Sequence, residues 1–285
     1  MSVESKNKKI TVATFLNKKE KKEKITMLTA YDYSTARYID EAGVDSILVG
    51  DSLGMVVLGY ETTHNVTMDE MKIFTAAAAR GVKNSMLIAD MPFMSYHTTI
   101  DEALKNAGEL IQCGANAVKL EGASDFILSV IKRMVETGIP VVGHLGFTPQ
   151  YLNTLGGYKV QGKTFENTML IFEQTKKLAE AGVFAITLEM VPEESAKYIT
   201  ENISVPTIGI GAGRYCDGQV LVCDDILGRY SDFTPKFARK YADLKSVISQ
   251  AAKSYAQDVA TGKFPAEAEV FHLSEEELVR LEGHK

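Results

Sequence analysis

The chain has 285 residues, of which 45% are hydrophobic and 24% are charged. These proportions are typical of globular proteins and exclude collagen-like, largely disordered and disulfide-scaffold classes. The formal net charge of −6 argues against a protein whose main partner is nucleic acid, because such proteins carry a basic surface. The three cysteines, Cys113, Cys216 and Cys223, have no metal-ligand spacing and indicate a reducing compartment.

The N-terminal segment MSVESKNKKI has no apolar stretch of the kind found in secretory signals. No apolar run approaches the roughly 18 residues of a membrane span. We therefore expect a cytoplasmic protein with no membrane association. Five lysines crowd residues 18–24, broken by Glu20 and Glu23. A nucleic-acid or anionic-lipid patch is one interpretation of that stretch, but its mixed charges favour a solvated face.

One pattern recurs five times between residue 41 and residue 190: a helical stretch ends in glycine, and a short apolar run follows. Glycine supplies the left-handed residue that ends a helix, and nearly continuous apolar runs are typical of parallel strands covered on both faces. The pattern predicts an α/β fold, a (β/α)8 TIM barrel with additional C-terminal helices. A doubly wound sheet is the alternative, weakened because no G-x-G-x-x-G motif follows the first strand. The strands are expected within residues 25–32, 41–51, 79–90, 112–122, 137–146, 180–190, 205–213 and 220–223.

Several helices have recognisable starts. Thr67-x-x-Glu70 and Thr99-x-x-Glu102 have the form of capping boxes, in which the two side chains satisfy backbone N–H groups reciprocally. Pro192 suits a first helical position.

The C-terminal part differs in character. Apolar residues recur in steps of three and four from Phe237 to Val259, which predicts one long amphipathic helix over residues 235–261. We expect a single domain over residues 1–285, with the barrel at about 25–230 and a helical extension at about 235–285. The long helix is expected to close the barrel or to pack on a sister subunit, with a partner-binding helix as the alternative. The last stretch, LSEEELVRLEGHK, predicts a short charged helix.

An acidic or histidine side chain follows each helix-ending glycine by six to nine residues. Because all strands of such a barrel end on one face, four carboxylates and one imidazole are expected to converge there. Any one of them alone is typical of a turn or helix cap, whereas four together repel one another unless a cation lies among them. These residues are Asp51, Asp90, Glu121, His144 and Glu189.

The expected cation is Mg2+, since the available ligands are oxygens and Mg2+ takes one or two carboxylates together with water and substrate oxygens. Zinc needs cysteines or several histidines at short spacing, and the sequence has neither. The alternative is a cluster that is partly protonated or paired with lysine.

Other polar residues lie beside these acids. Lys119 projects to the same side of its strand as Glu121, either as a Schiff-base lysine or, as its acidic neighbour favours, as a charge partner for a substrate carboxylate. Ser52 follows Asp51, where its hydroxyl and N–H can bind an anion. Glu189 ends a mostly apolar strand, a setting that suits a general base. The run GIGAG at 209–213 either cradles phosphate or allows a tight turn.

Eight segments of the sequence resemble the ketopantoate hydroxymethyltransferase family, and they occur in the family's order from about residue 10 to about residue 262. GDSLGM and GHLGFTPQ are the most specific. The matching segments are TAYDYSTA (29–36), LVGDSLGMV (48–56), ADMPFMSY (89–96), VKLEG (118–122), GHLGFTPQ (143–150), GGYKVQG (156–162), LEMVP (188–192) and IGIGAG (208–213).

The resemblance implies an enzyme of pantothenate and coenzyme A biosynthesis on a (β/α)8 barrel. It transfers a hydroxymethyl group from 5,10-methylenetetrahydrofolate to 3-methyl-2-oxobutanoate, giving 2-dehydropantoate (ketopantoate), with Mg2+. The resemblance also implies that Asp51, Asp90 and Glu121 form the metal site, with Glu121 acting through water. Ser52 and Lys119, together with the two aspartates, match the positions that hold the 2-oxo acid. Glu189 matches the catalytic base. Family members form large homo-oligomers, typically decamers, which would give the long C-terminal helix a neighbour.

Two alternatives stay open. One is an Mg2+-dependent 2-oxo acid lyase or mutase of the phosphoenolpyruvate mutase type, which usually supplies a catalytic cysteine or extra arginines. Cys113 precedes a helix-ending glycine and does not end a strand, so the catalytic cysteine of that enzyme type is absent at the strand ends. The other is a non-catalytic barrel that binds a metal or an oxo acid, which has no need of Glu189.

Overall fold

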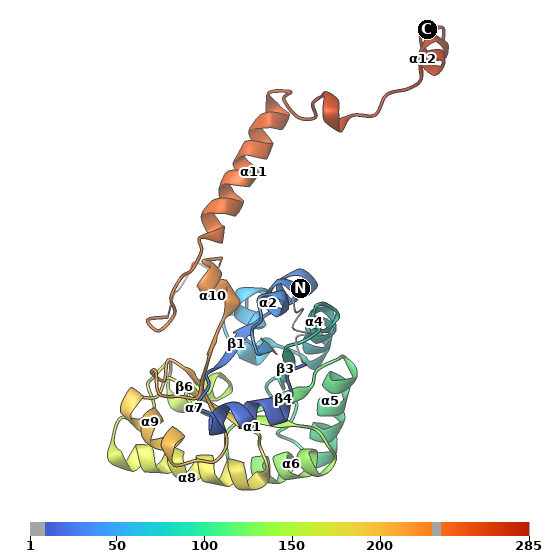
Figure 1. The fold of residues 1–285 in the computed structure, drawn as a ribbon. Coiled ribbons are helices and arrows are strands. Elements are labelled where there is room, and N and C mark those ends of the chain that lie inside the picture. The colour runs from blue at the N-terminus through green and yellow to red at the C-terminus, as the bar shows by residue number, and fades with distance from the viewer. Residues whose placement is uncertain (1–8, 230–234, 285) are drawn as a thin grey trace, which may run out of the picture.

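Eight parallel strands form a closed barrel in the computed structural model, which describes residues 9–229 and 235–284 (Figure 1). Each strand pairs with its neighbours in sequence, and β8 pairs with β1 in the register Ile25 to Gly218. The closed order confirms the predicted (β/α)8 barrel and excludes the doubly wound alternative. The strands are β1 (Ile25–Thr29), β2 (Ser46–Val49), β3 (Met86–Asp90), β4 (Ala117–Glu121), β5 (Val141–Gly146), β6 (Ala185–Glu189), β7 (Thr207–Ile210) and β8 (Gly218–Leu221).

Helices surround the barrel, and short ones lie in the loops after the strands. The connection from β7 to β8 is residues 211–217 and contains no helix. Gly211 and Gly213 have positive φ of 63° and 77° in this connection, which favours the tight-turn interpretation of GIGAG. The helices are α1 (Val12–Glu20), α2 (Tyr33–Glu41), α3 (Leu53–Val56), η1 (Thr63–Asn65), α4 (Met68–Gly81), α5 (Ile100–Gln112), α6 (Asp125–Glu136), η2 (Pro149–Tyr151), α7 (Leu152–Leu155), α8 (Phe165–Ala181), α9 (Glu193–Glu201), α10 (Cys223–Leu227), α11 (Leu244–Ala260), η3 (Glu267–Glu269) and α12 (Glu275–Glu282).

The glycine pattern that predicted the barrel is confirmed at four positions and is wrong at Gly81. Gly81 is the last residue of α4, and a Cβ there would lie 2.5 Å from the carbonyl oxygen of Tyr33 in α2. Close packing of α4 on α2, rather than a left-handed turn, therefore explains this glycine. The four confirmed positions, where the glycine that ends the helix has a positive φ, are Gly43, Gly114, Gly138 and Gly182.

The expected helix starts are partly confirmed. Thr67 and Glu70 form a complete capping box. Thr99 caps α5 by accepting from the N–H of Glu102, but the Glu102 carboxylate accepts from the hydroxyl of Thr98 and so leaves the box incomplete. Pro192 is the N-cap of α9 and not its first helical residue.

The N-terminal helix α1, which the sequence analysis did not anticipate, closes the amino-terminal end of the barrel. Phe15 is fully buried among the inward-facing side chains of the strands, with its ring centroid 5.4 Å from that of Phe184. Lys18 pairs with Asp45, which immediately precedes β2. The solvated-face interpretation is therefore wrong at this end of the lysine-rich stretch, because α1 brings the Lys18 ammonium against the Asp45 carboxylate at the start of a strand.

The C-terminal helix begins later than predicted, because Asp243 caps α11 by accepting from Ser246 N–H. Phe237 packs on the β7–β8 connection, where a Cβ on Gly211 would lie 2.6 Å from its ring, and Tyr241 N–H donates to Ile226 O at 2.7 Å. The periodic apolar residues before 244 therefore belong to a loop. The expected boundary at 230–235 falls mostly outside the described residues.

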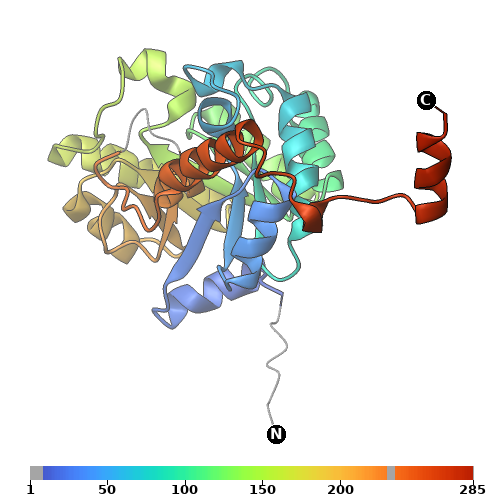
Figure 2. The ribbon, with the colours of Figure 1, turned by 90° about the horizontal axis from the view of Figure 1, so that it is seen from above.

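Helix α11 leads away from the barrel, and the chain runs on to α12 beyond the outline of the barrel (Figures 1 and 2). No residue of α11 is buried, and its exposed apolar residues include Val247, Ile248, Tyr255 and Val259. Among the described residues, no helix is both long enough and apolar enough to cross a membrane.

Candidate active site

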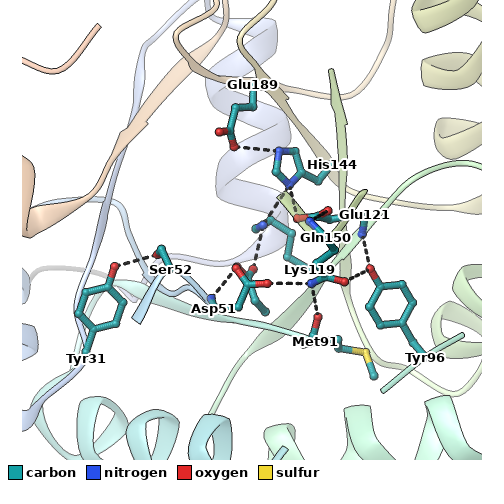
Figure 3. Close-up of polar contacts among 11 residues, drawn as sticks. Tyr31, Asp51, Ser52, Met91, Tyr96, Lys119, Glu121, His144, Gln150 and Glu189 are labelled. Atoms are coloured by element: carbon teal, nitrogen blue, oxygen red, sulfur yellow. Dashed lines mark hydrogen bonds and ion pairs between the residues drawn. The ribbon is translucent and has the colours of Figure 1, made fainter. Parts of the chain in front are cut away.

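The acidic residues predicted to converge do so at the carboxyl-terminal end of the barrel (Figure 3). Asp90, Glu121 and Glu189 are the last residues of β3, β4 and β6. Asp51 lies two residues beyond β2, and His144 lies within β5 in register with Glu121. A parallel barrel places all of these strand ends on one face, which is why a regular spacing in sequence becomes a cluster in space.

Asp51 and Asp90 are held together by the turn after β2. The backbone N–H of Asp51 donates to Oδ2 of Asp90 at 3.1 Å, and both side chains are buried. A Cβ on Gly50 would lie 2.8 Å from Ser52 Oγ and 3.4 Å from Asp90 Oδ2, so the turn requires glycine to approach Asp90 this closely. Burial, and then the neighbouring charge of Asp90, raise the pKa of Asp51 well above its usual range.

Lys119 supplies the positive charge at the centre of the cluster. Its Nζ lies 3.0 Å from Asp90 Oδ1 and 3.3 Å from His144 Nδ1. Burial opposes its charge, but the carboxylates of Asp90, Glu121 and Asp51 outweigh burial and raise the pKa of Lys119. A protonated ammonium is not nucleophilic, so the environment favours the charge-partner interpretation over a Schiff base.

Glu121 is 1% exposed and shares this charge environment. Its Oε2 accepts from the backbone N–H of Gln150 at 3.0 Å, whereas its Oε1 has no hydrogen-bond partner in the described part of the chain. Burial raises the pKa of Glu121 to about 8, against the lowering effect of Lys119.

His144 links this cluster to Glu189. Its Nε2 lies 3.2 Å from Glu189 Oε2, and its Nδ1 faces Lys119 and lies 3.4 Å from Glu121 Oε1. Burial and the positive charge of Lys119 lower the pKa of His144, which favours the neutral ring. The Lys119 ammonium can only donate, so Nδ1 accepts and the ring proton sits on Nε2, facing Glu189. The Glu189 side chain is 16% exposed and is the most accessible acid of the group.

Ser52 lies at the edge of the cluster, where its Oγ is 2.9 Å from the hydroxyl of Tyr31 (Figure 3). Sequence reasoning missed Tyr31, Tyr96 and Gln150 as members of the site. All three fall in segments that carry the family resemblance, but none has a charge or a periodic position that marks it on its own.

The acid cluster fits a divalent cation bound partly by water. Asp51, Asp90 and Glu121 are buried with one ammonium, so three ionised carboxylates would leave two uncompensated negative charges, which one Mg2+ would balance. Glu121 Oε1 is buried without a hydrogen-bond partner among the described residues, and Asp90 Oδ1 faces the Lys119 ammonium at 3.0 Å. No three acid, histidine or cysteine side chains among the described residues are placed to hold one ion together. Mg2+ usually takes one or two carboxylates and keeps several waters, so it does not require three protein ligands.

Solved structures with similar folds include phosphonopyruvate hydrolase complexed with oxalate and Mg2+, at a TM-score of 0.60 and 12% identity, over 96% of this chain and 95% of that one. Another is 2,3-dimethylmalate lyase, a member of the PEP mutase/isocitrate lyase superfamily, at a TM-score of 0.58 and 14% identity, over 95% and 98% of the two chains. At such identities the likeness concerns the fold alone.

Closer relatives carry one name. The 3-methyl-2-oxobutanoate hydroxymethyltransferase of Acetivibrio thermocellus is 54% identical over 94% of this chain and 95% of its own length. The enzyme of the same name from Syntrophomonas wolfei is 53% identical over 96% and 99% of the two lengths. The model of the ketopantoate hydroxymethyltransferase family matches residues 9–267. The chain therefore belongs to the ketopantoate hydroxymethyltransferase family.

Proposed function

We propose that this chain transfers a hydroxymethyl group from 5,10-methylenetetrahydrofolate to 3-methyl-2-oxobutanoate and so forms 2-dehydropantoate for pantothenate and coenzyme A biosynthesis. The observation that carries the proposal is the juxtaposition of two kinds of site in a chain of this family. A buried acid–lysine cluster lies next to a more accessible carboxylate, Glu189, with His144 between them. The first suits a metal and a 2-oxo acid, and the second suits proton removal.

Asp51 and Asp90 would hold Mg2+ directly, and Glu121 would hold it through water. When bound, Mg2+ supplies a Lewis acid at the keto oxygen, where negative charge develops as the C3 proton leaves. The paired contact between Asp51 N–H and Asp90 Oδ2 fixes the relative position of the two carboxylates before any ion binds.

Lys119 and Ser52, with the two aspartates, would bind the 2-oxo acid. The Lys119 ammonium would pair with the substrate carboxylate, since it is already protonated and held in place by Asp90. Ser52 Oγ, whose partner is the hydroxyl of Tyr31, can donate to a second carboxylate oxygen while accepting from Tyr31.

Glu189 would remove the C3 proton, and the resulting enolate carbon would attack the one-carbon unit of the folate as its iminium ion. His144 Nε2–H stabilises the ionised carboxylate of Glu189 and orients it before proton transfer. The neutral ring of His144 does not compete with Glu189 as a base, because its accepting nitrogen, Nδ1, is engaged by the Lys119 ammonium.

The chain would act as one barrel domain, in the cytoplasm, within a homo-oligomer, which we propose to be a decamer. The support for assembly is α11, whose apolar residues are uncovered in the single chain. Exposed apolar stripes of this kind mark protein–protein interfaces.

The proposed function is tested by an assay of 2-dehydropantoate formation from 3-methyl-2-oxobutanoate, with and without methylenetetrahydrofolate and Mg2+. Product that requires all components supports it. Carbon–carbon or carbon–phosphorus cleavage of a 2-oxo acid without folate would instead indicate a lyase or mutase. Binding of the oxo acid and Mg2+ without turnover would indicate a non-catalytic barrel.

A further inference from the structure

Gln150 is the most extensively hydrogen-bonded residue at the edge of the acid cluster. It lies in η2, just after β5, and is 4% exposed. Its side-chain Nε2 donates to Asp51 Oδ2 at 2.8 Å and to Met91 O at 2.9 Å, and its Oε1 accepts from the Tyr96 hydroxyl at 2.7 Å (Figure 3). Its backbone N–H donates to Glu121 Oε2 at 3.0 Å. One residue thus contacts two of the proposed Mg2+ acids.

The orientation of the Gln150 amide is fixed by groups that cannot change role. The carbonyl oxygen of Met91 can only accept, so the NH2 group of Gln150 must face it. The second hydrogen of the same NH2 group then points to Asp51. The opposite orientation would place the amide oxygen against the carbonyl of Met91 and the carboxylate of Asp51, which are both acceptors.

Tyr96 holds the other side of the amide. Its hydroxyl proton goes to Gln150 Oε1, and its oxygen accepts from the backbone N–H of Glu121 at 3.1 Å. Tyr96 is fully buried, so water does not compete for these bonds. The amide is therefore held between the Met91 carbonyl, which can only accept, and the Tyr96 hydroxyl, which donates to it.

Asp51 and Glu121 each accept from Gln150 through one oxygen, whereas Asp90 is held through both of its oxygens. Gln150 engages Oδ2 of Asp51 and Oε2 of Glu121, and Asp51 N–H engages Oδ2 of Asp90. Among the described residues Glu121 Oε1 has no hydrogen-bond partner, whereas Asp90 Oδ1 pairs with the Lys119 ammonium at 3.0 Å. Fixing one oxygen of a carboxylate aims the second one, which is how residues behind a metal ligand tune its affinity.

We propose that Gln150 is a positioning residue that orients Asp51 through its side-chain amide and Glu121 through its backbone N–H, so that both carboxylates face the Mg2+ position. This inference rests on the proposed function for the identity of the metal. It assigns Gln150 no contact with substrate.

The test compares Gln150→Met, which keeps the length of the side chain and removes its donors, with the matched change Gln161→Met. The Gln161 side chain donates to Lys159 O at 2.9 Å, in a loop outside the cluster. Isothermal titration calorimetry with Mg2+ alone gives the metal affinity of each folded protein. Loss of a group that supports a metal ligand typically weakens binding by about 10- to 100-fold, and we expect that range for Gln150→Met and no change for Gln161→Met.

A second readout separates positioning from general damage to the fold. The Mg2+ concentration for half-maximal activity should rise by the same factor as the dissociation constant, while the KM for methylenetetrahydrofolate stays at the wild-type value. Wild-type Mg2+ affinity in folded Gln150→Met would overturn the inference. If Gln150→Met does not fold, Tyr96→Phe decides, because it releases the amide without removing it: weakened Mg2+ binding supports the inference and unchanged binding overturns it.

Failure of the inference and failure of the proposed function give different results. A wild-type protein that forms 2-dehydropantoate, with unchanged Mg2+ affinity in Gln150→Met, refutes only the role of Gln150. A wild-type protein that forms no product, but whose Mg2+ affinity falls in Gln150→Met, refutes only the reaction.

Discussion

Glu189→Gln is the substitution that separates proton removal from binding. The amide has the shape of the carboxylate, and its oxygen can still accept from His144 Nε2–H, which lies 3.2 Å from Oε2 in the wild type. The His144 ring beside it is neutral, so the change leaves no buried charge unpaired. The neutral amide, however, cannot accept the C3 proton. Loss of a general base typically costs about 10² to 10⁴ in rate, equivalent to about 2.7–5.4 kcal/mol in the activation barrier.

The assay is exchange of the C3 proton of 3-methyl-2-oxobutanoate with deuterated solvent, followed by NMR in the presence of Mg2+ and without folate. We expect exchange in the wild type and a loss of this size in Glu189→Gln, with binding of the oxo acid retained or slightly tightened. Glu193→Gln is the matched control, since Glu193 starts α9 and pairs with Arg214 at 2.7 Å. Exchange at the wild-type rate in Glu189→Gln would remove Glu189 from the mechanism.

Three further predictions follow from the structure. Asp51→Ala and Asp90→Ala should each abolish Mg2+-dependent turnover, because water does not replace the charge of a carboxylate ligand; an unchanged Mg2+ titration of activity in either variant would contradict the metal site. Deleting residues from 236 onward should lower the number of subunits measured by light scattering, since α11 is uncovered in the single chain, whereas an unchanged number of subunits would mean that α11 packs within its own subunit. Burial, and then Asp224, raise the pKa of Asp225 to about 6. Folding stability therefore falls as pH rises from the ordinary carboxyl range through 6, where Asp225 ionises in the folded protein. Asp225→Asn should therefore raise the melting temperature more at about pH 8 than at about pH 4, and an equal change at both would refute the pKa argument.

The sequence was sufficient to predict the barrel and its charged residues. Each strand of a parallel barrel is covered on both faces, so an acid at its end stands out against an apolar background. The roughly constant spacing from Gly43 to Asp51 and from Gly182 to Glu189 reflects strands of similar length. The same regularity misled at Gly81, where close contact between two helices requires glycine for a different reason.

Residues whose place depends on a distant partner could not be predicted. Gln150 and Tyr96 meet across 54 positions of sequence, and neither has a periodic or charged signature. Phe15 lies just before the lysine-rich stretch, and its burial depends on the open end of a barrel formed later in the chain. Phe237 continues a helical period but packs on Gly211, because tertiary contact outweighs local pattern.

Helix α1, which closes the amino-terminal end of the barrel, is made early but depends on residues that are made late. Lys19 of α1 bonds to Thr200 O and Asp217, which follow it by 181 and 198 residues. At about 5–20 residues per second, a ribosome needs about 10–40 s to supply those partners. Helix α1 therefore cannot complete its contacts until the residues at the start of β8 have been synthesised and β8 pairs with β1. It is among the last elements to reach its place.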